Sequence, residues 1–117
     1  MNSAQPLPVN AQPGFAGPAH LRDGIFRALQ GVVDPELSLS IVDVGLIYGV
    51  DVTETHVTVN MTMTSPACPV TDVIVGDVED ALDTILPQNY TIAVEIGWEP
   101  AWDSSRMTPR ARLLMGW

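Results

Sequence analysis

The residue with the clearest potential for chemistry is Cys68, the single cysteine of the chain. It lies in residues 61–74, Met-Thr-Met-Thr-Ser-Pro-Ala-Cys-Pro-Val-Thr-Asp-Val-Ile, where a strand pattern gives way to a helix pattern. Pro69 suits the first helical position because its missing N–H needs no partner there. We therefore expect Cys68 at or near the helix N-cap, where backbone N–H groups and the helix dipole favour an anion. A thiol in such a position has a lowered pKa and is more often thiolate, the form that attacks electrophiles and binds metals.

Cys68 also admits a purely structural interpretation, because free cysteine is among the most buried residue types and packs as a small apolar side chain. The sequence leaves both interpretations open. With one cysteine, an intramolecular disulfide is excluded. The two histidines, His20 and His56, fall at element starts that we expect to be exposed, so neither is an evident general base for a thiol nucleophile.

Two regular patterns meet near Cys68 and would position it. Residues 56–64 alternate apolar and polar side chains, which predicts a half-buried strand. Residues 70–85 place apolar side chains three or four residues apart, which predicts an amphipathic helix. The polar side of this helix carries acidic side chains: Asp72, Asp77, Glu79, Asp80 and Asp83.

The remaining segments predict a small α+β domain, or equally a two-layer α/β sandwich. Before the hairpin we predict a helix over residues 19–32, ended by Asp34-Pro35, and a loop over residues 34–40. Residues 41–53 should form a strand after a short entry segment, and residues 90–97 should form another strand. One or two helical turns follow within residues 103–115, with a helix start at Thr108-Pro109. Residues 45–53 and 56–64 should form an antiparallel hairpin. The order helix-strand-strand-helix-strand gives a sheet of about three strands covered by two main helices.

The predicted organisation is a flexible Pro/Gly-rich arm over residues 1–18 and a single domain over residues 19–117. Phe15 of the arm could pack onto the domain or onto a partner. The net charge of the chain is −9, and it contains no lysine. Such a surface repels phosphate backbones and anionic lipids, so we expect no binding to nucleic acid or to a membrane surface. The start of the chain lacks a secretory signal pattern and no stretch could span a membrane, so a cytoplasmic location is the default expectation.

Four segments, in this order along the chain, together resemble one known family. They are Asp34-Pro-Glu-Leu37, Ile41-Val-Asp-Val-Gly-Leu-Ile-Tyr48, residues 57–69 with the sequence Val-Thr-Val-Asn-Met-Thr-Met-Thr-Ser-Pro-Ala-Cys-Pro, and residues 102–112 with the sequence Trp-Asp-Ser-Ser-Arg-Met-Thr-Pro-Arg-Ala-Arg. In these features the chain is similar to the SufT/PaaD-type family of metal–sulfur cluster biosynthesis, formerly a domain of unknown function. The resemblance covers about residues 20–115.

The resemblance implies a small α/β domain, often a homodimer, that acts in iron–sulfur cluster assembly or in transfer of clusters to apo-proteins. The family cysteine maps onto Cys68, the expected thiolate contact to iron or sulfur, and the motif aspartate maps onto Asp34, which would orient the loop or contact metal. Four further candidates support the loop: Glu36, Asp43, Thr64 and Ser65. Asp43 could be a surface residue or a partly buried carboxylate that orders its loop.

One feature of PaaD proteins, an additional cysteine-rich C-terminal portion, does not follow Trp117 in this sequence, so the chain is expected to resemble the short SufT-like form. One thiolate cannot hold an iron–sulfur cluster, which usually needs four protein ligands. We therefore expect a transient cluster or iron ion, with no tightly bound cofactor. Stable binding would need Cys68 from two subunits together with other ligands.

Three functions remain open. The first is a cluster assembly or transfer factor whose partners are cluster-assembly proteins and apo iron–sulfur proteins. The second is a metal-free adaptor that links this machinery to targets, such as an accessory subunit of an aromatic-acid oxygenase system, through the acidic helix and the Trp98/Trp102 segment. The third, an enzyme with a cysteine nucleophile, ranks last.

Tryptophan is a residue type that dominates interfaces, and the chain has three: Trp98, Trp102 and Trp117. We nevertheless expect Trp98 and Trp102 to cover the core.

Overall fold

The computed structural model describes residues 13–64, 68–99 and 101–116, with only the helical backbone of Cys68 and Pro69. The helices within this part of the chain are α1 (Ala19–Gln30), α2 (Ile41–Val44), α3 (Cys68–Ile85) and α4 (Pro109–Met115), and a 3-10 turn spans Ser104–Arg106. The strands are β1 (Gly14–Ala16), β2 (Val33–Asp34), β3 (Leu39–Ser40), β4 (Ile47–Thr53), β5 (His56–Met61) and β6 (Thr91–Ile96). The predicted α+β fold is confirmed.

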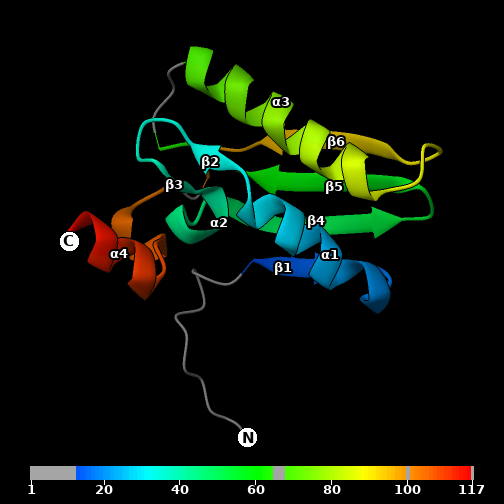
Figure 1. Cartoon of the computed structure of the whole chain (residues 1–117), viewed down its shortest axis with the longest axis horizontal. Coiled ribbons are helices and arrows are strands. Elements are labelled where there is room, and N and C mark those ends of the chain that lie inside the picture. Colours follow the sequence, from blue (N-terminus) through cyan, green and yellow to red (C-terminus); the bar gives the residue numbers. More distant parts are fainter. Residues whose placement is uncertain (1–12, 65–67, 100, 117) are drawn as a thin grey trace, which may run out of the picture.

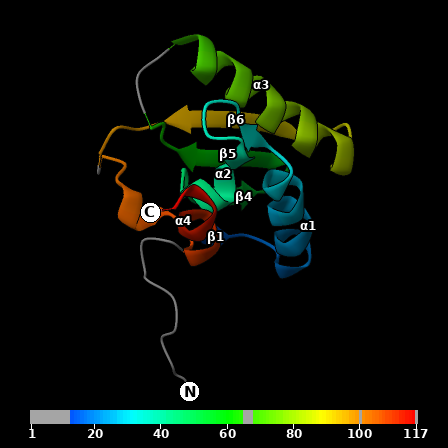
Figure 2. The same ribbon diagram turned by 60° about the vertical axis from the view of Figure 1, so that its left-hand side comes forward.

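The main sheet has the strand order β1-β4-β5-β6. Strands β4 and β5 form the predicted antiparallel hairpin, while β5 and β6 are parallel and are connected through α3. Helices α1 and α3 lie side by side over one face of the sheet (Figures 1 and 2). The start of α3 therefore lies beyond the carboxyl end of β5.

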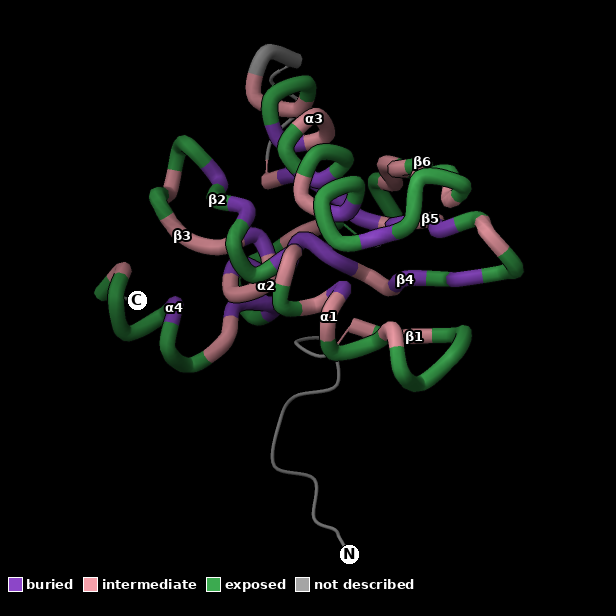
Figure 3. Tube along the Cα trace, turned by 45° about the vertical axis from the view of Figure 1, so that its right-hand side comes forward, coloured by how far each residue is buried: buried purple, intermediate pink, exposed green. Residues whose placement is uncertain are grey.

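The core lies between the two helices and the sheet, as the purple segments of Figure 3 show. Strand β5 alternates as predicted: Val57, Val59 and Met61 are buried, whereas the residues between them are not. Helix α3 contributes Ile74, Val78 and Leu82 at helical spacing. Each such side chain stabilises the fold by roughly 1.5–3 kcal/mol through burial. Within the described residues, no helix combines the length and the apolar composition that a membrane span requires.

Strand β1 lies within the segment that we predicted to be a flexible arm. Gly14, Phe15 and Ala16 pair in parallel with β4 and add a fourth strand to the predicted three. Phe15 packs against the core and meets Phe26 of α1 edge-to-face, with 6.2 Å between ring centroids. This apolar contact explains the ordered strand; residues 1–12 lie outside the described part of the chain.

Two local predictions were wrong. The segment predicted as a loop over residues 34–40 begins and ends in the short antiparallel pair β2–β3. The predicted strand entry at residue 41 is instead the single helical turn α2. Ser40 caps this turn by accepting a hydrogen bond from the Val42 N–H at 3.2 Å, and Gly45 ends it with a left-handed φ of 86°. Capping and packing therefore outweigh the strand preference of the β-branched residues in α2.

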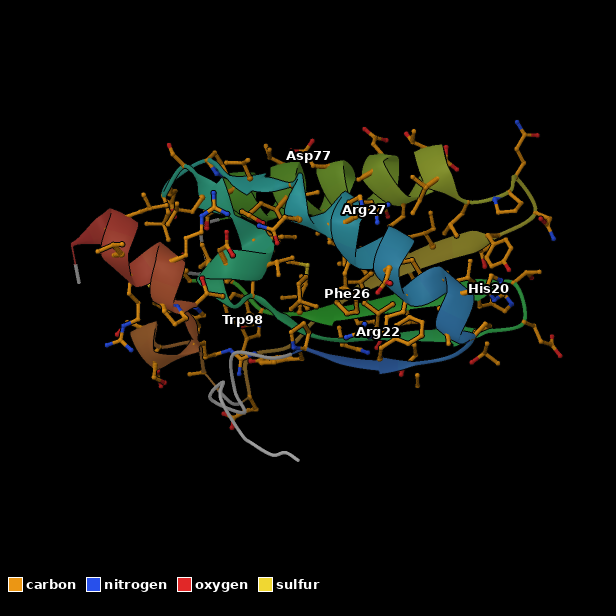
Figure 4. All side chains as sticks on the ribbon, turned by 60° about the horizontal axis from the view of Figure 1, so that its bottom comes forward. His20, Arg22, Phe26, Arg27, Asp77 and Trp98 are labelled. Carbon is orange, nitrogen blue, oxygen red and sulfur yellow. The ribbon has the colours of Figure 1, made fainter. Side chains whose placement is uncertain are left out.

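The two tryptophans of the exit segment behave differently. Trp102 is half-buried and packs against the core, as expected. Trp98 is 46% exposed, so the prediction that it covers the core was wrong. It follows the edge strand β6, and Figure 4 shows it away from α1.

Candidate functional site

Cys68 is the first residue of α3, which agrees with its predicted place at the helix start. Ligand sites in open sheets with parallel strands lie beyond the carboxyl ends of those strands, and the β5–α3–β6 connection brings Cys68 to such an edge. The β2–β3 pair lies at the same end of the molecule, and β2 contacts α3 (Figure 1). The Cys68 side chain and Ser65 lie outside the described residues, so their roles stay predictions.

Asp34 organises the turn between β2 and β3. Its side chain is buried, with 1% relative exposure, and Oδ1 accepts hydrogen bonds from the N–H groups of Glu36 at 2.8 Å and Leu37 at 3.4 Å. The Asp34 carbonyl accepts from the Ser38 N–H at 2.7 Å, and Ser38 has a positive φ of 57°. Asp34 thus orders the turn between β2 and β3, while its role toward the cysteine loop or a metal stays a prediction. Glu36 is exposed and takes part through its backbone.

Asp43 is a half-buried carboxylate that joins three segments. Its Oδ2 accepts a hydrogen bond from Nε2 of Gln30 in α1 at 3.0 Å, and its Oδ1 accepts from Oγ1 of Thr108 at 3.4 Å. The Asp43 carbonyl accepts from the Thr108 N–H at 2.8 Å. Asp43 was expected to be either a surface residue or a partly buried carboxylate that orders its loop. These contacts agree with the second expectation.

The residues that hold α2 from the far end of the chain were missed by sequence reasoning. Trp102 donates from Nε1 to the Val44 carbonyl at 2.8 Å, and Arg106 donates from Nε to the Gly45 carbonyl at 2.8 Å. The Arg106 guanidinium also lies 4.6 Å from the centre of the Tyr48 ring. We call Trp102, Arg106 and Thr108 the C-terminal clamp. Its members occur in the fourth segment that carried the family resemblance, which was the available signal.

Thr62, another residue that sequence reasoning missed, lies between β5 and the Cys68 segment. Its hydroxyl is fully buried and has no hydrogen-bond partner among the described residues. Its N–H donates to the Leu46 carbonyl at 2.8 Å, which ties it to the residue after Gly45. Thr62 stands at a polar position of the alternating pattern, yet it is buried together with Met61 and Met63, so the alternation gave no signal of its burial. The predicted candidate Thr64 is half-buried two residues further on.

The described side chains do not by themselves assemble a metal site. No three of the histidine, aspartate and glutamate side chains described are gathered closely enough to hold an ion. His56 is exposed and its Nδ1 pairs with Oγ1 of Thr91, and His20 is exposed as well. The structure therefore brings the Asp34 turn to the end of the sheet where α3 starts, and it places Asp43 in a separate network with the C-terminal clamp.

Comparison with known proteins identifies this architecture. The sequence profile of a family described as iron–sulfur cluster assembly protein matches residues 22–96. The chain is 42% identical over 99 residues to the Fe-S protein maturation auxiliary factor YitW of Bacillus subtilis, which spans 82% of this chain and 94% of that protein. It is 40% identical over 86 residues to the Fe-S protein maturation auxiliary factor SufT of Staphylococcus aureus, with 73% and 97% of the two chains covered.

A solved structure agrees with these sequence relatives. The crystal structure of a domain of unknown function, DUF59, from Bacillus anthracis superposes with a TM-score of 0.76 at 36% identity and covers 83% of this chain and 92% of that one. The resemblance predicted from the four sequence segments is thereby confirmed: the chain belongs to the iron–sulfur cluster assembly protein family, of the SufT type related to PaaD.

Proposed function

We propose that this protein is an auxiliary factor in the maturation of iron–sulfur proteins, which assembles or transfers a cluster to apo-protein targets. The observation that carries this proposal is similarity, over 94% and 97% of their lengths, to two proteins named as Fe-S protein maturation auxiliary factors. Both names describe accessory factors, and the proposal accordingly assigns no catalytic activity. The partners would be cluster-assembly proteins and apo iron–sulfur proteins.

In this proposal the cluster, or an iron ion, is cargo, and the Cys68 thiolate contacts its iron or sulfur. The position of Cys68 at the first residue of α3 supports this role, because the backbone N–H groups and dipole of a helix start stabilise a thiolate. One thiolate supplies too few ligands for stable binding. The cargo would therefore be held transiently, or shared between two copies, and no tightly bound cofactor is expected. A free thiolate needs a reducing compartment such as the cytoplasm.

The residues around Cys68 would support it in two ways. Asp34, buried in a turn on the strand that contacts α3, would fix this turn beside the cargo or contact iron with its carboxylate. The hydroxyls of Thr64 and Ser65 would donate to sulfur. The hydroxyl of Thr62 is buried away from such cargo; it has no partner among the described residues, and such a group costs about 1–3 kcal/mol if it stays unpaired.

A metal-free adaptor is the second candidate, and one observation favours it. Trp98 is 46% exposed, and tryptophan is enriched among the residues that dominate protein–protein interfaces. In this case Cys68 and Asp34 would shape the end of the domain, and Trp98 would contact assembly proteins or targets.

The test is anaerobic reconstitution with iron and sulfide, followed by transfer to apo-aconitase. Wild type is expected to show a cluster spectrum and to restore aconitase activity, whereas Cys68→Ser should lose both because oxygen replaces the soft sulfur ligand. Asp34→Asn is the matched variant that tests the carboxylate of Asp34, since the amide oxygen of asparagine can still accept the hydrogen bonds of the turn.

The outcomes separate the two candidates. If Cys68→Ser binds and transfers cluster as wild type does, the thiolate role is wrong. The adaptor function is favoured over the carrier function by a different outcome. In that outcome neither wild type nor Cys68→Ser takes up cluster, both still bind assembly proteins, and Trp98→Ala no longer binds them.

A further inference from the structure

A shallow groove runs between α1 and α3, away from Cys68, and has a volume of about 460 Å³. Its lining combines small apolar residues with two carboxylates: Ala28, Gly31, Val32, Val33, Asp77, Asp80 and Ala81. Val33 is 46% exposed. Val73, one helical turn before Asp77 on α3, is 51% exposed. The groove thus offers apolar contact area next to negative charge.

Among the described residues, no cation forms an ion pair with the two carboxylates of the groove. The ion pair found among the described residues joins Arg22 and Asp23 at the other end of α1. Arg27 is the cation of α1 nearest in sequence to the groove, and it makes no ion pair with Asp77 or Asp80 within the part of the chain described. Figure 4 shows Arg27 and Asp77 on the two helices that border the groove.

Helix α4 presents the complementary chemistry. It packs against the domain through Ala111, which is fully buried. Leu113, two residues further on, faces away from this contact and is 81% exposed, and Leu114, which neighbours Ala111 on the helix surface, is 61% exposed. Arg110 precedes these leucines by three and four residues and so lies on the same side of the helix. Arg112 is exposed as well. These are the two most exposed large apolar side chains of the described residues, and two cations accompany them.

Helix α4 does not reach the groove of its own chain. Helix α2 contacts both α1 and α4 and lies between them in Figures 1 and 3. The cap at Thr108, whose Oγ1 accepts from the Ala111 N–H at 3.2 Å, and the contacts of Thr108 to Asp43 fix α4 in this position. Its outward side is therefore available to another molecule.

We propose that α4 of one copy of this chain binds in the α1–α3 groove of a second copy, with Leu113 and Leu114 on the apolar lining and Arg110 and Arg112 near Asp77 and Asp80. Each copy carries both surfaces, and the proposed binding is reciprocal, with two identical contacts related by a two-fold axis. This inference gives the expected homodimer an interface. It stands independently of the proposed cluster role, because neither surface includes Cys68 or Asp34.

The test is a charge exchange followed by sedimentation equilibrium. One variant carries Asp77→Arg with Asp80→Arg, and the other carries Arg110→Glu with Arg112→Glu. Each variant alone faces like charge at both contacts and should dimerise more than about tenfold more weakly than wild type. An equimolar mixture should recover a heterodimer, because both contacts then join opposite charges.

Two further variants separate this interface from a general charge effect. Glu79→Arg with Asp83→Arg makes the same charge change on α3 outside the groove lining and should leave dimerisation unchanged. Leu113→Ser with Leu114→Ser removes the apolar contact without a charge change and should give monomers. All of these side chains are exposed, so circular dichroism should show an unchanged fold. A wild type that stays monomeric at millimolar concentration, or a dimer that neither charge reversal weakens, would overturn the proposal.

Discussion

The β2–β3 turn and the α2 turn both direct an aspartate of a family motif inward, but they are held by different means. Asp34 is held locally, since its partners are the N–H groups two and three residues further along the same turn. Asp43 is held by distant residues, Gln30 of α1 and Thr108 before α4. The first turn can therefore form from its own sequence, whereas the second depends on the packing of the whole domain.

The substitution with the largest expected effect on stability tests the contacts from distant residues that hold the α2 turn. A Cβ added at Gly45 would lie 2.2 Å from the Arg106 carbonyl oxygen, and the φ of 86° is unfavourable for any residue with a Cβ. Gly45→Ala should displace the C-terminal clamp and lower the free energy of unfolding by about 3–5 kcal/mol, as measured by urea denaturation.

Gly76→Ala is the matched control for this substitution. Gly76 lies within α3, and a Cβ there would meet nothing within 4 Å. The substitution should raise the free energy of unfolding by about 0.5–1 kcal/mol because alanine favours helix. If Gly45→Ala were as stable as wild type, the clamp would not be needed to hold α2.

A substitution with an intermediate effect on stability tests the local hydrogen bonds that hold the β2–β3 turn. Asp34→Ala leaves two N–H groups of the turn without their buried acceptor and should cost about 1–3 kcal/mol of unfolding free energy. Asp34→Asn keeps an acceptor oxygen and should cost less than about 1 kcal/mol. Thermal unfolding of both variants beside wild type measures the difference. Equal losses would mean that the charge of Asp34, rather than its hydrogen bonds, holds the turn.

The smallest effect concerns a carboxylate outside both turns. The hydroxyl and the N–H of Ser105 donate to Asp103 and lower the pKa of this exposed carboxyl below its usual value. A lowered folded-state pKa means that the contribution is present above the unfolded pKa and is lost as pH falls through the folded one.

We therefore expect the melting temperature of Asp103→Asn to fall slightly less than that of wild type on acidification. A thermal melt series from about pH 5 to about pH 2 covers the window in which the carboxyl titrates. Identical slopes for the two proteins would show that Asp103 is not linked to folding.

Long periodic segments were predictable from sequence because each encodes its own pattern. The alternation in β5 and the helical spacing in α3 both appear in the structure, and Thr108 caps α4 as predicted. The elements that were missed are short. A two-residue strand such as β2 carries no periodicity, and β1 is defined by a parallel partner in β4, far along the chain.

In the candidate site, too, local features could be predicted from the sequence and contacts between distant segments could not. That Asp34 orders its turn could be predicted, because an aspartate before proline commonly forms such turns. The partners of Asp43, the clamp formed by Trp102 and Arg106, and the buried hydroxyl of Thr62 depend on contacts between distant segments. A single sequence does not specify these contacts, although its motifs mark the residues that make them.

Strand β1 has a consequence for how the sheet opens. It is paired along only three residues and anchored by Phe15, whereas β4 and β5 are paired along most of their length. Local opening free energies follow the amount of structure lost. The amide protons shared between β1 and β4 should therefore exchange with solvent through a local detachment of β1, while those between β4 and β5 exchange only when the domain unfolds.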